Sequence, residues 1–247
     1  MSVNAILPFL STAVMLAFTV FVLQRYAARR APHFLFWGLG LAMFGAGSLA
    51  EAYLALAWNK WVFFVWYFFG AVLNAGWIGH GTVYLLFRKK WVHGLTAILV
   101  LGSLIALALM LQVMPRLDAS PCADGCIISE HYRSIMPSVQ DGATVRLTTP
   151  FFNIYGLLTL VGGALWSAFL FWRKRVLPNR VVGNVLIAAG ALSIGFASTL
   201  TRLGYGSLLY LGELVAALLM FAGFLTAAAP QPGEEPVSSA AAAPASN

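Results

Sequence analysis

The chain has 247 residues, of which 60% are hydrophobic and only 9% charged, and its formal net charge is +7. A water-soluble domain needs about a quarter of its residues charged to cover its surface, so this composition excludes an ordinary soluble protein. Because the basic residues gather in alternate loops, the positive charge indicates membrane topology, and no nucleic-acid partner is expected.

Seven continuously apolar stretches fill most of the chain. A helix of about 20 apolar residues covers the hydrocarbon core of a bilayer, and it satisfies its own backbone hydrogen bonds there. The sequence therefore predicts an all-α, multi-pass membrane protein in which residues 1–228 form a seven-helix bundle. The predicted spans are 4–23, 34–57, 61–87, 94–114, 150–172, 181–201 and 208–228.

The basic residues predict the orientation of these spans. Ten of the fifteen Lys and Arg residues lie in the loops that follow the first, third and fifth spans. Such loops are retained in the cytoplasm, so the N-terminus is predicted to lie outside and the C-terminus inside. The short loops favour the cytoplasmic (plasma) membrane of a prokaryote.

Only one connection, residues 115–149, is long, and it is predicted to face the extracytoplasmic side. It contains Cys122 and Cys126, and the oxidising compartment predicts a disulfide between them. The alternative is a metal site that uses both thiolates and His131, completed by Asp124 or Glu130. Residues 229–247 are rich in Ala, Pro and Ser, which predicts a disordered cytoplasmic tail.

Ionisable side chains inside a membrane span are costly and therefore mark candidate functional sites. Glu51 lies about 25 Å along the second span and Glu213 about 8 Å into the seventh, which places both near the outer face. Arg202 ends the sixth span at the same face. The sequence predicts a ligand-binding pocket that is open to the outside, lined by Glu51, Tyr53, Asn74, Arg202, Tyr210 and Glu213. Alternatively, an Arg202–Glu213 ion pair only fastens the last two helices.

His80 is the one histidine placed clearly inside a span, about 10 Å from the inner end of the third helix. We expect it to hydrogen bond to a neighbouring helix. A haem b held by two histidines is the alternative, but His33 and His93 lie in inner loops.

With seven spans and an N-terminus predicted to lie outside, the chain resembles the retinal-binding rhodopsins. Its last span, however, has no lysine for a Schiff base. Residues Arg30–Phe87 resemble part of the seven-helix sensory regions of bacterial signalling proteins, although no output domain follows. Compared with membrane hydrolases of the ceramidase type, the chain has only one buried histidine. No resemblance transfers a site residue, no catalytic set is recognisable, and an enzymatic role is not expected.

Three functions follow from these observations. The first is a non-catalytic membrane module that binds a small or lipidic ligand, or a partner protein, from the extracytoplasmic side. The second is a secondary transporter or proton-coupled carrier in which Glu51 and Glu213 titrate. The third is a haem- or quinone-linked membrane redox subunit. Membrane lipids are expected partners in every case, and no cofactor is predicted.

Overall fold

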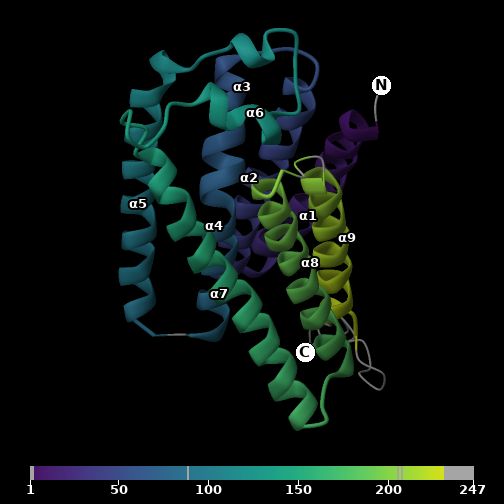
Figure 1. Ribbon diagram of the computed structural model, residues 1–247. Helices are drawn as coiled ribbons and strands as arrows, with labels where there is room; N and C mark the ends of the chain where they lie inside the picture. Colours follow the sequence, from purple (N-terminus) through teal and green to yellow (C-terminus); the bar gives the residue numbers. More distant parts are fainter. Residues whose placement is uncertain (1–2, 88, 205, 207, 231–247) are drawn as a thin grey trace, which may run out of the picture.

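The computed structural model describes residues 3–87, 89–204, 206 and 208–230, and this part of the chain contains only helices and their connections (Figure 1). The α-helices are α1 (Val3–Arg29), α2 (Pro32–Leu54), α3 (Lys60–Val65), α4 (Asn74–Leu86), α5 (Trp91–Val113), α6 (Ile128–Ile135), α7 (Val145–Arg173), α8 (Pro178–Arg202) and α9 (Leu208–Ala228). A π-helix, η1 (Trp66–Leu73), joins α3 to α4, and the short 3₁₀ turns η2 (Met114–Arg116) and η3 (Ser120–Cys122) lie between α5 and α6.

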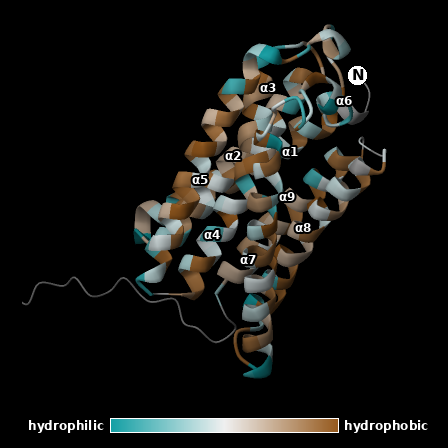
Figure 2. Cartoon of the chain, turned by 60° about the vertical axis from the view of Figure 1, so that its left-hand side comes forward, coloured by the Kyte–Doolittle hydropathy of each residue, from teal (hydrophilic) through white to brown (hydrophobic). Residues whose placement is uncertain are grey.

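Seven helical segments in this part of the chain are long and apolar enough to cross a membrane, which confirms the predicted number of spans. They are Ile6–Arg29, Pro32–Leu54, Lys60–Leu86, Trp91–Arg116, Val145–Arg173, Pro178–Thr201 and Leu208–Ala228. In Figure 2 apolar residues dominate these helices, whereas hydrophilic residues gather at their ends and in the loops. The chain is thus a multi-pass helical membrane protein.

Some helix boundaries differ from the sequence prediction. Helix α1 continues six residues beyond the predicted end at residue 23, because basic residues can extend a helix past the apolar core without breaking it. Helix α7 begins at Val145, five residues before Pro150, which the helix accommodates near its start. The long connection is therefore only partly a loop, since it contains η2, η3, α6 and the first turn of α7.

Six of the spanning helices form a closed ring. In order around the ring they are α1, α2, α4, α7, α8 and α9, each packed against the next, with α9 returning to α1. Helix α5 lies outside this ring against α4 and α7, at the edge of the molecule (Figure 1). Helices α2 and α9 are therefore not neighbours in the ring, because α1 lies between them.

Small residues allow the helices of the ring to approach closely. A Cβ atom on Gly183 of α8 would lie 2.6 Å from the backbone nitrogen of Ala227 on α9. A Cβ atom on Gly47 of α2 would lie 2.6 Å from the Cα atom of Gly70, in the π-helix. Association of membrane helices depends on such close packing, because lipid tails are as apolar as the helix surfaces.

The two ends of the bundle differ in charge. The loop end carries residues 114–144, the turn between α2 and α3, the turn between α8 and α9, and the start of α1 (Figure 1). The basic end carries the connections α1–α2, α4–α5 and α7–α8. All six acidic residues between positions 3 and 230 lie in the half of the bundle toward the loop end. Which of the two ends faces the cytoplasm stays a prediction from the loop charges.

Candidate functional site

Two glutamates from non-neighbouring helices meet in the half of the ring toward the loop end. Glu51 on α2 is 1% exposed and Glu213 on α9 is 8% exposed. Their carboxyl groups lie close enough to interact electrostatically, and Glu51 Oε2 has no hydrogen-bond partner among the described residues. A carboxylate can only accept hydrogen bonds, so a proton on one of the two groups would allow them to form a hydrogen bond with each other. We call Glu51 and Glu213 the acidic pair.

Each carboxyl group of the acidic pair also accepts a hydrogen bond from a second side chain. The indole Nε1–H of Trp66, at the start of the π-helix, donates to Glu51 Oε1 at 2.7 Å. The hydroxyl of Ser48, one turn before Glu51 on α2, donates to Glu213 Oε2 at 3.4 Å. Among the described residues no basic side chain forms an ion pair with either glutamate. The hydrogen bonds that hold the pair therefore come from the neutral donors Trp66 and Ser48.

The long connection covers the acidic pair at the loop end. The hydroxyl of Tyr210, one turn before Glu213, is fully buried and lies near both glutamates and near Ser129 of α6, but it forms no hydrogen bond with the described residues. Ser129 in turn donates to the backbone oxygen of Gly206, in the α8–α9 turn, at 3.2 Å. The backbone N–H of Cys126 donates to the oxygen of Leu54, at the end of α2, at 2.9 Å. Helix α6 therefore lies as a lid over α2 and the α8–α9 turn.

The structure brings together only three of the predicted pocket residues, Glu51, Tyr210 and Glu213, and it buries them instead of opening them to the outside. Tyr53 is 45% exposed because it lies two residues from Glu51, about 200° around the helix, and so faces away. Asn74 lies beside Gly40 on α2, eleven residues and about 16 Å before Glu51. Arg202 ends α8, but its side chain lies outside the described residues, so its ion pair with Glu213 stays a prediction.

Three further residues of this group, Ser48, Trp66 and Ser129, were not predicted. The spacing of Ser48 and Glu51 offered a signal, because residues three apart share a helix face. No comparable signal marked Trp66, which bonds to Glu51 from the next span, or Ser129, which approaches Tyr210 from the long connection.

His80 connects three helices in the half of the bundle toward the basic end. Thr96 of α5 donates its hydroxyl proton to Val92 O at 3.0 Å, so its oxygen accepts from His80 Nε2–H at 2.8 Å and from the Tyr84 hydroxyl at 2.9 Å. His80 Nδ1 then accepts from the Tyr155 hydroxyl of α7 at 2.6 Å. Every group is satisfied with a neutral imidazole. Because both ring nitrogens are engaged, His80 does not fit the hypothesis of a haem ligand.

The cysteines of the long connection form a disulfide, Cys122–Cys126. The ligand atoms of Cys122, Cys126 and His131 lie within 4.8 Å of one another, so the structure brings together the residues of the alternative metal site. Thiolates bind metals, and disulfide sulfurs are not thiolates. The metal hypothesis therefore does not fit this oxidised form.

A second feature of the ring is a cavity of about 60 Å³ toward the basic end. All six ring helices contribute to its walls, which are mainly apolar, including Phe18, Trp37, Ile78, Leu160, Met220 and Phe224. The ring thus encloses a buried acidic pair near one end and a hollow near the other.

By these features the chain belongs to the class of multi-pass helical membrane proteins, and it carries a buried carboxyl pair. Comparisons of the chain with family models, curated proteins and solved structures gave no match.

Proposed function

We propose that the protein is a proton-coupled carrier of the prokaryotic cytoplasmic membrane, with the acidic pair as its proton-binding site. The observation that carries this proposal is the contact of two buried carboxyl groups from α2 and α9 inside a membrane-spanning ring. Intramembrane carboxyl groups are rare, and where they occur they commonly belong to proton relays and ion pathways.

The contact offers a physical mechanism for coupling. Two carboxylates about 4 Å apart repel each other by about 4 kcal/mol at an effective dielectric constant of about 20. One bound proton replaces this repulsion with a hydrogen bond. Proton release would therefore drive α2 and α9 apart, and these helices lie on opposite sides of α1 in the ring. Binding of a proton is in this way linked to the shape of the ring interior.

The two ends of the ring support the same proposal. Toward the loop end, α6 covers the acidic pair through Ser129 and the Cys126–Leu54 hydrogen bond. Toward the basic end, the ring contains a cavity. A carrier exposes its central site to each side of the membrane in turn, so an arrangement closed at one end and hollow toward the other matches one state of such a cycle.

The test is a flux assay with the purified protein in liposomes that contain a trapped pH-sensitive dye. Amino acids, sugars and small carboxylic acids are added in turn, with and without an imposed pH gradient. We expect one class to move protons together with substrate, and Glu213→Gln to abolish this movement. Asp124→Asn, which alters an exposed carboxylate of the disulfide loop, serves as the matched control. Absence of coupled flux over the whole panel counts against a carrier.

A non-catalytic binding module is the second candidate, and the lid formed by α6 favours it. A ligand or partner protein that displaced α6 would reach the acidic pair from the predicted extracytoplasmic side. In that case α6 would be displaced without any transport. Hydrogen exchange of residues 128–135, measured with and without extracts of the native membrane, would reveal such a ligand.

The third candidate, a redox subunit, needs a cofactor that His80 is not arranged to hold. An absorption spectrum of the protein purified from native membrane tests this candidate directly. A Soret band would revive it.

A further inference from the structure

The cavity of the ring ends beside an arginine, Arg25, that forms no ion pair with an acidic residue in the described part of the chain. Phe224 of α9 lines the cavity, and the Arg25 guanidinium lies 5.3 Å from the centre of the Phe224 ring and 5.1 Å from that of Phe21. Arg25 is half-buried on α1, one turn after Val22, which also lines the cavity. An arginine stacked on the wall of an apolar cavity thus marks its basic end.

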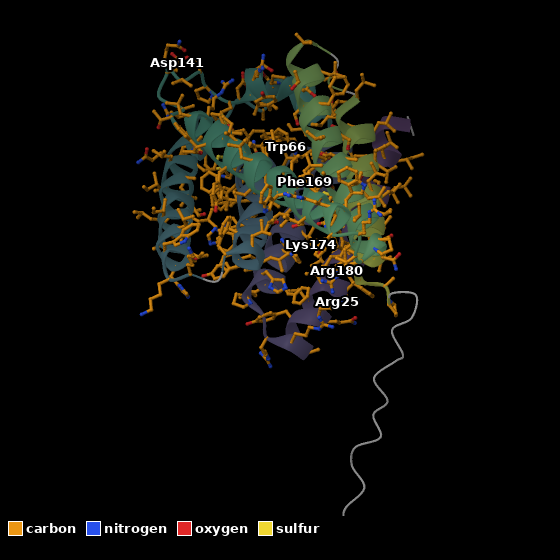
Figure 3. All side chains as sticks on the ribbon, turned by 90° about the horizontal axis from the view of Figure 1, so that it is seen from below. Arg25, Trp66, Asp141, Phe169, Lys174 and Arg180 are labelled. Atoms are coloured by element: carbon orange, nitrogen blue, oxygen red, sulfur yellow. A yellow bond between two sulfur atoms is a disulfide. The ribbon has the colours of Figure 1, made fainter. Side chains whose placement is uncertain are left out.

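Positive charge around this site is not compensated within the described part of the chain. Figure 3 looks at the basic end and labels Arg25, Lys174 and Arg180, which come from α1, from the α7–α8 turn and from α8. The acidic residues of positions 3–230 all lie in the opposite half, and Glu234 and Glu235 lie outside the described residues. The field at the mouth of the cavity therefore attracts an anion.

The polar residues of the cavity lie toward the same end. Asn184 lines the cavity, and its side-chain amide donates to the backbone oxygen of Arg180, one turn nearer the start of α8, at 2.7 Å. Ser167, six residues before the end of α7, is a second polar lining residue. Deeper in, the walls are apolar. The cavity is thus polar near the basic end and apolar further in.

The cavity volume matches the end of a hydrocarbon chain. One water-sized group needs about 10–15 Å³ by this measure, so a cavity of about 60 Å³ accepts about four to six such groups. Apolar cavities of this kind stay dry and bind apolar molecules. In a bilayer the available apolar molecule is a lipid tail, which gains packing contacts there but little hydrophobic energy. Selectivity must then come from the headgroup.

From this geometry we propose that the ring binds an anionic phospholipid at its basic end, with the phosphate on Arg25 and one acyl chain in the cavity. The lipid comes from the leaflet at the basic end, because Arg25 lies on that side of the apolar walls. Neutral lipids share the acyl chain but lack the net charge, so they bind more weakly. The site is separate from the acidic pair, although it uses the same cavity that the carrier proposal cites, and lipid binding does not require transport.

The test is native mass spectrometry of the full-length protein, delipidated in detergent and titrated with phosphatidylglycerol or with phosphatidylcholine of the same chains. One basic residue near an anionic headgroup is worth about 1 kcal/mol, so we expect about five-fold tighter binding of phosphatidylglycerol. Arg25→Gln should remove this preference. Arg29→Gln, an exposed arginine one turn further along α1, should retain it. Equal binding of both lipids by the unaltered protein, or an unchanged preference in Arg25→Gln, would overturn the proposal.

Two further experiments test the contributions of the acyl chain and of the headgroup separately. Ala164→Phe fills the cavity and should weaken the binding of phosphatidylglycerol and of phosphatidylcholine alike. Ser167→Leu, at a half-buried position of the cavity wall, repeats the test if Ala164→Phe fails to fold. Inorganic phosphate and glycerol phosphate compete for the headgroup position alone. If either displaces phosphatidylglycerol at equal concentration, or if both filling variants bind normally, the site takes a free anion and the lipid proposal is wrong.

Discussion

Replacement of Glu51 tests the hydrogen bonds of the acidic pair most directly. Glu51→Gln keeps an oxygen that can accept from Trp66 Nε1–H and adds an amide that can donate to Glu213. Glu51→Leu has a similar volume but removes both interactions. The indole N–H of Trp66, which donates to Glu51 at 2.7 Å, is then left buried without an acceptor, and the Glu213 carboxyl keeps only Ser48.

The expected loss of stability in Glu51→Leu is about 2 kcal/mol. A buried polar group that loses its partner costs about 1–3 kcal/mol, whereas side-chain hydrogen bonds in membrane proteins average only about 0.6 kcal/mol. In Glu51→Leu both the Trp66 indole and the Glu213 carboxyl lose a partner, and the smaller membrane-protein values offset this, so the expected total lies near the middle of the range of about 1–3 kcal/mol. We expect Glu51→Gln to change the free energy of unfolding by less than about 0.5 kcal/mol, because it retains both contacts.

The assay is reversible unfolding by sodium dodecyl sulfate in mixed micelles, followed by circular dichroism. A double-mutant cycle with Trp66→Phe isolates the Trp66–Glu51 interaction, for which we expect a coupling energy of about 1 kcal/mol. If Glu51→Leu is as stable as the unaltered protein and the coupling energy is zero, the two carboxyl groups are not held as described. The carrier proposal would then lose its structural basis.

Four further outcomes are expected. Tyr155→Phe removes the donor to His80 Nδ1, so it should cost about 1 kcal/mol in the same unfolding assay, and no loss would contradict the hydrogen-bond assignment. Gly183→Ala forces a Cβ atom against Ala227 and should lower the free energy of unfolding by about 1–3 kcal/mol. Gly162→Ala, where the added Cβ meets open space, should be neutral or stabilising. Equal effects of the two substitutions would argue against the α8–α9 contact. The backbone N–H of Ser120 donates to Asp118 and lowers the pKa of that carboxyl, so this hydrogen bond stabilises the loop above the ordinary pKa and is lost as the pH falls through the lowered one. The protection of the Ser120 amide against hydrogen exchange, relative to its intrinsic rate, should fall there, and Asp118→Asn should remove this pH dependence. After reduction in intact cells, a membrane-impermeant thiol reagent should label Cys122 and Cys126, and labelling only in opened cells would invert the predicted orientation.

Part of the acidic site was accessible from the sequence. Glu51 and Glu213 stand out as charged residues in apolar spans, and counting 1.5 Å per residue gave them a common depth. Tyr210 followed from its spacing of three residues to Glu213. Depth does not specify direction, however. Tyr53 has nearly the depth of Glu51, and the rotation of α2 alone points it to the exterior, at 45% exposure.

The position of α6 over the acidic pair could not be predicted from the sequence. Ser129 belongs to a polar connection, and its place above Tyr210 depends on the Cys126–Leu54 hydrogen bond and on the packing of α6 against Gly206. These contacts join segments that are far apart in the chain. Trp66 likewise donates to Glu51 from the first residue of the π-helix, and no apolar pattern in the sequence indicated either this hydrogen bond or the π-helix.

By itself, the sequence determined that the chain crosses a membrane, how many times it crosses and where each crossing lies, because apolar length and charge are properties of a single segment. Only the tertiary structure decided that six helices close into a ring, that two glutamates lie buried close together inside it and that Arg25 borders a cavity. The physical reason is that these features depend on the rotation of each helix about its own axis and on its choice of neighbours. In lipid both are decided by close packing and buried hydrogen bonds between segments, which no single segment contains.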